Sequence, residues 1–270
     1  MRIARFQDET GSIRFGTPVE DTKALGLEGN LYEGLRETGE PFQVHKWLAP
    51  VAPVNIYCIG LNYRAHAEET GAKIPEHPVL FMKPTTAIAH PGDPIPLPVS
   101  CDRGPEVDYE AELTVVIGRA AKNVSEGQAL EHVLGYTCAN DVSARRWQKH
   151  GGGAQWVRGK SFDGFCPLGP VLVTADEIPD PQTLGVRCLL NGETMQSGNT
   201  DDMIFSVAEL IARLSRDTTL LPGTLILTGT PPGVGFARTP PVFLQDGDLV
   251  RVEIDRIGAL ENPVRNAPTL

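Results

Sequence analysis

The five cysteines of this 270-residue chain are scattered, odd in number and never arranged as a C-x-x-C pair. Their pattern therefore indicates neither a disulfide framework nor a cysteine zinc site. Free thiols of this kind are typical of a reducing compartment, so we expect a cytoplasmic protein.

Positive charge is also scarce. Lys and Arg number 24 against 34 Asp and Glu, which gives a formal net charge of −10, and no basic cluster is longer than Arg145-Arg146. A chain this acidic is a poor match for a phosphate backbone, so we expect no nucleic-acid partner. No apolar run approaches the roughly 18 residues of a membrane-spanning helix. Residues 1–6 lack the apolar core of a signal peptide, and we expect no membrane contact.

The first 50 residues have the pattern of a small separate unit. Residues 2–6 and 12–15 are predicted strands with a turn at Thr10-Gly11, and Pro50 and Pro53 mark a junction. We therefore predict a small N-terminal domain over residues 1–52 and a catalytic domain over residues 53–270.

The larger segment is rich in predicted strands, bounded by Gly, Pro and Asp. Residues 62–70, 143–149 and 204–214 have a helical tendency, and six prolines exclude regular helix from residues 84–105. Many strands and few helices favour a mainly β (α+β) fold over a doubly wound one. The predicted strands cover residues 55–59, 109–117, 135–139, 171–174, 186–190, 225–228 and 249–254.

The strand over residues 109–117 carries an unusual run of acids. Side chains alternate along a strand, so Asp108, Glu110 and Glu112 are predicted to point away from the apolar Tyr109, Ala111, Leu113 and Val115. Like charges stacked on one face are destabilising unless solvent or a cation compensates them. A solvated acidic face is one interpretation, and a site for a hard cation such as Mg²⁺, Mn²⁺ or Ca²⁺ is the other.

Asp141 follows a second apolar strand and precedes a short predicted helix. Asp in this position is most often a helix N-cap. A carboxylate ligand at the end of a buried strand is the alternative, and the residues alone leave both open.

Seven motifs occur in an order that resembles the fumarylacetoacetate hydrolase superfamily, from about Ile56 to about Asn262. They are GLNYRAHAEE (60–69), FMKP (81–84), DYEAEL (108–113), NDVSAR (140–145), GKSFD (159–163), MIFS (203–206) and TGTPPGVG (228–235). The resemblance implies mixed β-sheets rolled around the active site, usually in a homodimer. It also implies Mg²⁺ or Mn²⁺, with Ca²⁺ possible, held by Glu110, Glu112 and Asp141, and it leaves Asp108 out.

The resemblance assigns further site residues by position. His66 and Glu69 lie one helical turn apart and would activate a water molecule, while Lys160 would stabilise negative charge on a substrate oxygen. Arg145 and Gln148, three apart on a helix, would bind the substrate carboxylate. Thr230, in a turn, would hold the other end of the acid through its backbone and hydroxyl.

The resemblance, with these residues, implies a metal-dependent hydrolase that cleaves a C–C bond in a small 1,3-dicarbonyl acid of the acylpyruvate or fumarylpyruvate type, through a metal-bound enolate. The same site suits two alternatives, oxaloacetate decarboxylation and isomerisation of 2-hydroxyhepta-2,4-dienedioate. A non-catalytic binding protein on this scaffold is a remote alternative.

Two features depart from the common pattern. Arg146 stands where the family often has an acid, and the glycine-rich loop His150–Ala154 follows the predicted helix. Both are predicted to lie beside the carboxylate-binding residues, where they would indicate an additional negative group on the substrate.

Overall fold

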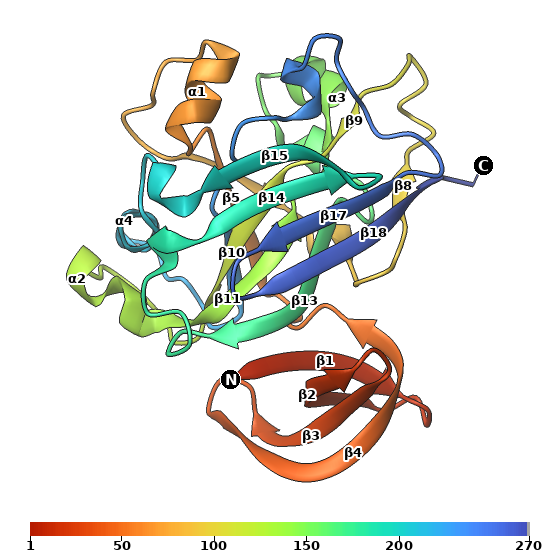
Figure 1. The fold of residues 1–270 in the computed structure, drawn as a ribbon. Helices are drawn as coiled ribbons and strands as arrows, with labels where there is room; N and C mark the ends of the chain where they lie inside the picture. The colour runs from red at the N-terminus through yellow and green to blue at the C-terminus, as the bar shows by residue number, and fades with distance from the viewer. Residues whose placement is uncertain (269–270) are drawn as a thin grey trace.

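The computed structural model describes residues 1–268 and is built mainly of β-strands (Figure 1). The largest sheet runs in the order β2-β3-β4-β1-β13-β11-β10-β16-β5-β6, and β7 adds to it beside β13. Its strands are β1 (Arg2–Asp8), β2 (Ile13–Glu20), β3 (Lys23–Asn30), β4 (Gly34–Leu48), β5 (Asn55–Gly60), β6 (Val79–Lys83), β7 (Ile88–Ala89), β10 (Ala111–Ile117), β11 (Val133–Asn140), β13 (Cys166–Thr174) and β16 (Thr224–Leu227).

A second sheet of five strands covers one face of the first. Its order is β15-β14-β17-β18-β8, with β15 (Glu193–Asn199), β14 (Gly185–Leu190), β17 (Leu249–Ile254), β18 (Gly258–Asn266) and β8 (Ile95–Leu97). A short pair joins β9 (Val107–Asp108) to β12 (Ser143–Ala144). The mainly β prediction is confirmed.

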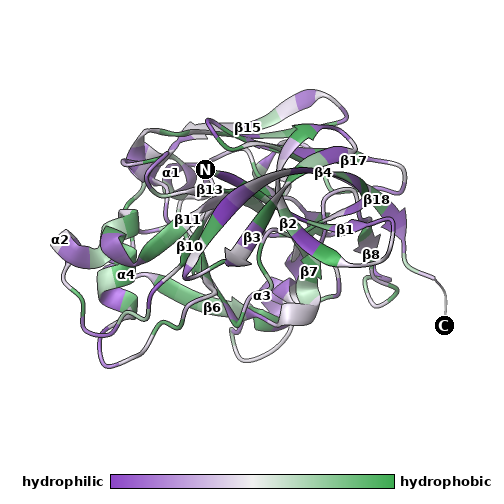
Figure 2. Ribbon diagram, turned by 90° about the horizontal axis from the view of Figure 1, so that it is seen from below, coloured by the Kyte–Doolittle hydropathy of each residue, from purple (hydrophilic) through white to green (hydrophobic). Residues whose placement is uncertain are grey.

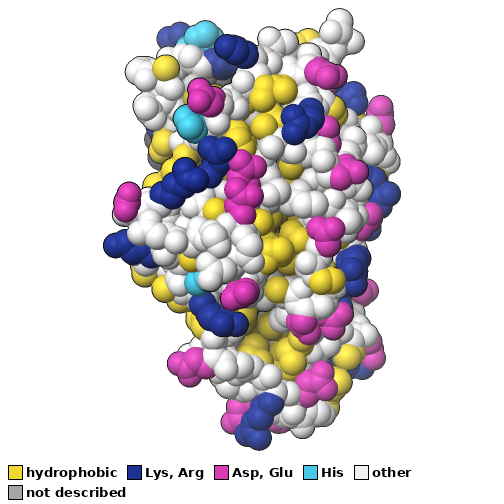
Figure 3. All heavy atoms as spheres, turned by 90° about the vertical axis from the view of Figure 1, so that its left-hand side faces the viewer, with side chains coloured by type: hydrophobic (Ala, Val, Ile, Leu, Met, Phe, Trp, Pro, Cys, Tyr) yellow, Lys and Arg dark blue, Asp and Glu magenta, His cyan; other side chains and the backbone are white. Residues whose placement is uncertain are grey.

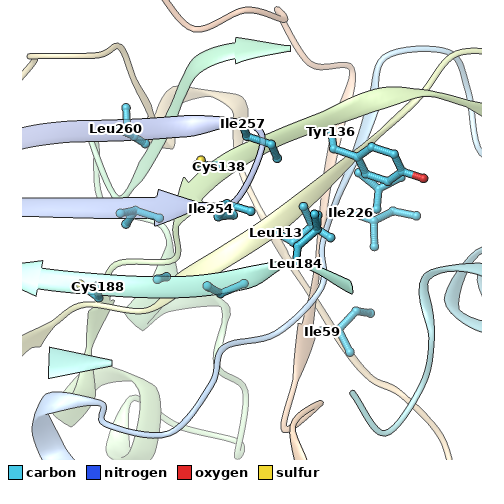
Figure 4. Close-up of a cluster of buried hydrophobic side chains, with 14 of the residues drawn as sticks. Ile59, Leu113, Tyr136, Cys138, Leu184, Cys188, Ile226, Ile254, Ile257 and Leu260 are labelled. Carbon is cyan, nitrogen blue, oxygen red and sulfur yellow. The ribbon is translucent and has the colours of Figure 1, made fainter. Parts of the chain in front are cut away.

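The main core lies between the two sheets, as Figure 4 shows. Leu113 and Tyr136 from the large sheet meet Cys188, Ile254 and Leu260 from the smaller one, and all are buried. Viewed from below, hydrophobic colour runs along β10 and β11, the strands beneath this core (Figure 2). Burial of this apolar surface supplies the main stabilisation of the fold. Glu110 directly precedes β10, and Asp141 directly follows β11.

Helices are few and short. They are α1 (Arg64–Thr70), α2 (Glu126–Ala129), α3 (Arg145–His150) and α4 (Val207–Leu214), with several single 3₁₀ turns between strands. Ser206 caps α4 by accepting a hydrogen bond from the Glu209 N–H, and α4 buries Val207, Leu210 and Ile211. The predicted helical segments are thus confirmed within a few residues, and residues 84–105 contain no α-helix.

The N-terminal segment differs from its prediction. It holds four strands, β1–β4, where the sequence indicated two, because β3 and β4 expose most of their polar and glycine residues and lack an alternating apolar pattern. Figure 1 shows these strands gathered at one end of the molecule. Hydrogen-bonded pairing of Arg2 with Val173 and Ile3 with Leu172 joins β1 to β13 in the main sheet. A domain boundary at residue 52 stays a prediction.

Two further features are the distribution of charge on the surface and the length of the helices. On the face shown in Figure 3, Lys and Arg side chains are interspersed with Asp and Glu side chains. Within residues 1–268, no helix is both long and apolar enough to cross a membrane.

Candidate active site

Glu110, Glu112 and Asp141 form a buried acid cluster, with one carboxylate oxygen from each lying within 4.8 Å of the others. Strand pairing brings them together, because Ala111 on β10 faces Asn140 on β11 in an antiparallel register. The Asp141 N–H donates to the Glu110 carbonyl at 2.8 Å, and the Asn140 side chain accepts from the Glu110 N–H at 2.9 Å. These bonds fix both chain segments, so the backbone itself brings the carboxylates together.

Asp108 does not join the cluster. The regular pairing of β10 begins only at Ala111, so the alternation predicted from Asp108 to Glu112 is broken at residues 109–110. The Asp108 carboxylate instead accepts hydrogen bonds from the Gly235 and Phe236 N–H groups and from Arg145 Nε, at 2.8, 3.0 and 2.8 Å. The prediction that Asp108 shares a face with Glu110 and Glu112 was wrong, and its omission as a ligand agrees with this position.

Three cations compensate the acids. Lys160 Nζ lies 2.7 Å from Glu110 Oε2 and 2.7 Å from Asp141 Oδ2. Arg145 Nη1 lies 2.7 Å from Glu110 Oε1, and Lys83 Nζ lies 2.6 Å from Asp141 Oδ1. All of these side chains are buried, so each unpaired charge would be costly.

The cations act unequally on the acids. Burial opposes ionisation of Glu110, but Lys160 and Arg145 outweigh it and lower the pKa of this carboxyl to about 2. Glu112 faces no such cation at close range. Burial, reinforced by the negative charges of Asp141 and Glu110, raises the pKa of Glu112 well above its usual range, although the Gly229 N–H donates to it at 2.7 Å. The three cations equal the three acids in number, but they lie beside Glu110 and Asp141, so the charge of an ionised Glu112 is the least compensated of the three.

Lys83 is a buried cation beside the acid cluster that the sequence analysis did not assign to the site. Its ammonium donates to three backbone carbonyls, those of Val142, Lys160 and Phe165, at 3.0, 2.8 and 2.7 Å. An ammonium has three donors, so Asp141 Oδ1 lies beside the charge but accepts no hydrogen bond. A signal existed: Phe81 and Lys83 share one face of β6, and a buried Phe81 implies a buried Lys83.

The residues present fit a divalent cation. Asp141 Oδ1 is buried and, although Lys83 Nζ lies 2.6 Å away, accepts no hydrogen bond from the described residues. Burial and the neighbouring acids oppose the negative charge of Glu112. Carboxylate oxygens without sulfur or imidazole suit Mg²⁺ or Mn²⁺, and also Ca²⁺. A 2+ ion would stabilise the ionised form of Glu112, with which no cation among the described residues forms an ion pair.

A cavity of about 320 Å³ opens beside the cluster. Such a volume suits a small organic acid. Its walls bring together most of the residues singled out in the sequence, with Glu69 and Asp141 just outside. The lining comprises Ile59, Gly60, Leu61, His66, Thr70, Ala72, Phe81, Glu110, Glu112, Arg145, Gln148, Lys149, Trp156, Lys160, Thr230 and Phe236.

His66 stands on this wall with Glu69 beside it. His66 Nδ1 lies 2.9 Å from Glu69 Oε2, the contact expected one turn apart on α1. The other carboxylate oxygen, Glu69 Oε1, accepts from the Gly233 N–H at 2.8 Å. Glu69 thus orients the imidazole and leaves Nε2 as the nitrogen available to a ligand.

Arg145 and Gln148 lie together on α3, where Arg145 Nη1 donates to Gln148 Oε1 at 3.0 Å. Arg145 Nη2 is buried and has no hydrogen-bond partner among the described residues. A buried donor without a partner costs free energy that an acceptor on a ligand would recover.

Arg146 does not lie where the sequence analysis predicted it, beside the substrate-binding residues. Its side chain turns to Glu106, with Nη2 donating to Oε1 at 2.9 Å, and it is not among the residues of the cavity wall. The loop His150–Ala154 is likewise outside the wall, although Trp156 beyond it is part of it. Neither therefore supports an extra anionic site.

Thr230 lies on the wall with its hydroxyl already engaged. The hydroxyl donates to the Ala111 carbonyl at 2.9 Å and accepts from Gln196 Nε2 at 2.7 Å. Since its single proton is committed, the hydroxyl can offer a ligand only acceptor capacity, and the backbone N–H remains as the donor in the predicted role.

Gly60 allows Trp156 to close one side of the cavity. A Cβ on Gly60 would lie 2.2 Å from the Trp156 ring, which also packs edge-on against Phe81. We expect Gly60→Ala to displace the indole, to lower the free energy of unfolding by about 1–3 kcal/mol and to weaken substrate binding. Gly127→Ala is the matched control, because no atom lies within 4 Å of a Cβ there. Equal melting temperatures for the two variants would contradict the packing role of Gly60.

The match to known proteins covers most of the chain. Residues 55–265 match the sequence model of the fumarylacetoacetate (FAA) hydrolase C-terminal family. The chain belongs to this family. The mitochondrial oxaloacetate tautomerase fahd2 of Xenopus laevis is 53% identical over 218 residues, which cover 80% of this chain and 67% of the relative. The human mitochondrial oxaloacetate tautomerase FAHD2A is 48% identical over 219 residues, covering 81% and 69%.

Solved family structures are similar over nearly the whole fold. The 2-hydroxyhepta-2,4-diene-1,7-dioate isomerase of Mycobacterium marinum has a TM-score of 0.85 and 38% identity, with all of both chains covered. The fumarylacetoacetate hydrolase of Exiguobacterium antarcticum has a TM-score of 0.84 and 37% identity, covering 99% of this chain and 100% of its own. The chain is thus similar to enzymes named for tautomerisation, isomerisation and hydrolysis.

Proposed function

We propose that the protein interconverts the enol and keto forms of a small 2-oxo acid by proton transfer, at a site that depends on a divalent metal ion. The observation that carries this proposal is the placement of His66, Glu110 and Glu112 on the wall of one cavity, with Asp141 completing the acid cluster beside it. The names of the relatives support it, since most of those described act as tautomerases or isomerases. Among the predicted reactions, isomerisation thus has better support than hydrolysis.

The reaction needs little from the protein. The enol gives up the proton on its oxygen and gains one on carbon, so no atom is lost and no electron acceptor is required. A divalent ion held by Glu110, Glu112 and Asp141 would supply Lewis acidity at the 2-oxo group.

The chain's own residues divide the remaining tasks. Asp141 and Glu110 outweigh burial and raise the pKa of Lys160, so its ammonium stays protonated and can stabilise charge developing on the substrate oxygen. His66 would carry the proton, because its side chain lines the cavity and Nε2 is the nitrogen that Glu69 does not engage. Arg145 Nη2 and Gln148 would hold the carboxylate, and the Thr230 N–H would bind the far end of the acid.

We expect His66→Gln to lower kcat by about 10²–10⁴, because the glutamine amide cannot shuttle a proton. KM should change little, since the variant keeps a polar group of similar length. His45→Gln on the exposed face of β4 is the control. A His66 variant with wild-type kcat would exclude His66 as the proton carrier.

The test is to mix the purified, Mg²⁺-loaded protein with the enol form of oxaloacetate and follow its ultraviolet absorbance. Faster loss of the enol with total oxaloacetate conserved supports the proposal. Release of CO₂ would instead identify the decarboxylase.

Hydrolysis is the second candidate, because the His66–Glu69 pair can also take a proton from water. Acetylpyruvate supplies its test: formation of pyruvate and acetate would identify the hydrolase. Turnover of neither compound would favour the non-catalytic binding protein.

The homodimer and the location are further parts of the proposal. Leu80 and Met82 are exposed on β6, an edge strand of the main sheet, and would give an apolar contact surface for a second copy. A cytoplasmic location stays a prediction from cysteine usage, and the tautomerases of Xenopus laevis and human carry mitochondrial names.

A further inference from the structure

Asp108 is a completely buried carboxylate to which the proposed reaction gives no role. Its Oδ1 accepts hydrogen bonds from the N–H groups of Tyr109 and Gly235, at 2.9 and 2.8 Å. Its Oδ2 accepts from Arg145 Nε and from the Phe236 N–H, at 2.8 and 3.0 Å. A carboxylate has about four lone-pair sites, so these four bonds saturate it. The contribution of this side chain therefore lies in the groups that it holds in place.

The first of these groups is the guanidinium of Arg145. Asp108 holds its Nε, and Glu110 Oε1 lies 2.7 Å from its Nη1. The Phe236 ring covers one face of the guanidinium, with the ring centroid 4.4 Å from Cζ. Among the described residues, only the Nη2 of this group has no partner. The direction in which Nη2 points is thus set by the two carboxylates that hold the other nitrogens.

The second group is the tight turn of residues 233–236, which packs closely against Asp108. A Cβ on Gly235 would lie 2.5 Å from Asp108 Oδ1, so the backbone can come this close only at a glycine. Two residues earlier, the Gly233 N–H donates to Glu69 Oε1 at 2.8 Å. The turn is therefore held by Asp108 at one end and holds Glu69 at the other.

Glu69 in turn positions His66. Its second oxygen, Oε2, lies 2.9 Å from His66 Nδ1, the contact that orients the imidazole. A continuous path thus leads from the guanidinium of Arg145 through Asp108 and the turn to the imidazole. The two ends of this path have different tasks in the proposed reaction, because one binds the substrate carboxylate and the other carries the proton.

We propose that Asp108 is a positioning residue that fixes Arg145 and His66 relative to each other. It reaches the guanidinium directly, and it reaches the imidazole through the turn and Glu69. This inference rests on the proposed function and names the residue that keeps the two halves of that site in register. Register is important because a displacement of about 1 Å between reacting groups can lower a rate about a hundredfold.

Asp108→Asn tests this role with little change in shape. Each oxygen of Asp108 accepts from two N–H donors, so an amide nitrogen in either place faces two donors and breaks one pair of bonds. The ¹³Cε1–H NMR signal of His66, identified by its loss in His66→Gln, reports the effect in the full-length, Mg²⁺-loaded protein without turnover. Among the six histidines, His66 should show the largest change in chemical shift.

Asp8→Asn is the matched control. Asp8 is also buried and accepts from an arginine, Arg14, and from two backbone N–H groups, those of Thr10 and Ser12. It lies on β1 and is not part of the cavity wall. This variant should also lose stability, but its His66 signal, kcat and KM should match those of the wild type.

The kinetics should show both ends of the path. In Asp108→Asn, we expect kcat to fall by up to about a hundredfold and KM to rise at the same time, because the proton carrier and the carboxylate-binding group are both displaced. Adding Glu69→Gln should lower kcat by a smaller factor in this variant than in the wild type, since the contact that it removes is already loosened.

Tyr109→Phe loosens the same turn if Asp108→Asn does not fold. It removes the hydroxyl that donates to the Gly233 carbonyl at 3.3 Å and leaves Asp108 in place, so the His66 signal should move in the same direction by a smaller amount. A His66 signal at its wild-type position in Asp108→Asn, or in Tyr109→Phe if the first variant does not fold, overturns the inference. A displaced signal in a protein that fails the enol assay would reject the proposed reaction and leave the positioning role standing.

Discussion

Glu112→Gln should melt at a higher temperature than the wild type at pH 8 when divalent ions are removed with EDTA. Burial and the neighbouring acids raise the pKa of Glu112, so the folded wild type holds a proton that the unfolded chain releases. This group's contribution to stability is fully present below the unfolded pKa and is lost as pH rises toward the folded one. Each pH unit in that window costs about 1.4 kcal/mol.

The glutamine does not titrate, so the difference in melting temperature between variant and wild type, measured in EDTA, should vanish near pH 4 and grow toward pH 8. Adding Mg²⁺ should reverse the order. At about 100 times its dissociation constant, an ion that binds only the folded state adds about 2.7 kcal/mol, or roughly 5–10 °C in a protein of this size. The wild type should gain this stabilisation, and the variant should gain little.

Catalytic activity should fall when metal binding is weakened. We expect Glu112→Gln to lower kcat/KM by about a thousandfold or more. A neutral amide would bind a divalent ion less tightly than a carboxylate, and the site would lose the Lewis acid that the 2-oxo group needs. Glu193→Gln, on an exposed position of β15, is the control and should match the wild type in all three measurements. A variant that Mg²⁺ stabilises as strongly as the wild type would show that Glu112 is not a ligand.

Lys83→Met should destabilise the protein by about 3–5 kcal/mol, whether or not Mg²⁺ is present. The substitution leaves Asp141 beside an apolar side chain and removes the donors of three buried carbonyls. A metal ion can compensate the carboxylate but cannot donate to the carbonyls. Denaturant unfolding with and without Mg²⁺ measures both effects.

Lys160→Met provides the contrast. Lys160 Nζ hydrogen-bonds only to Glu110 and Asp141 among the described residues, and both carboxylates would gain a metal ion. We therefore expect Mg²⁺ to restore much of the stability of this variant while its activity stays low. If Mg²⁺ rescued Lys83→Met equally, the backbone contacts of Lys83 would not be important for the fold.

Strand periodicity explains why part of the site was predictable. Glu110 and Glu112 are two residues apart beside a buried strand, so their carboxylates reach one place, and the register of β10 with β11 adds Asp141. The motifs supplied the pairing of His66 with Glu69, which a helical turn makes geometrically simple.

The remaining features depend on tertiary contacts that periodicity does not encode. Asp108 follows the same alternation as Glu110, yet the break at residues 109–110 directs it to Arg145 and the Gly235 turn. Arg146 is adjacent to Arg145, but Glu106 holds it away from the cavity. The contact of Lys149 with the Phe236 ring has no local signal either, because the two residues lie 87 positions apart in the sequence.

The N-terminal strands illustrate the same limit in the fold. β4 is mostly exposed, so its sequence carries no apolar stripe, and its pairing with β1 and β3 is what makes it a strand. The buried strands were predicted well, because a buried strand requires the apolar residues that form the pattern.

The most direct test of the account is the anomalous scattering of crystals soaked in Mn²⁺. We predict a single strong peak within coordination distance of Glu110, Glu112 and Asp141, with Lys160 displaced from at least one of its two carboxylate partners. A crystal without a peak there, in which Lys160 still bridges Glu110 and Asp141, would contradict the metal centre on which the proposed function depends.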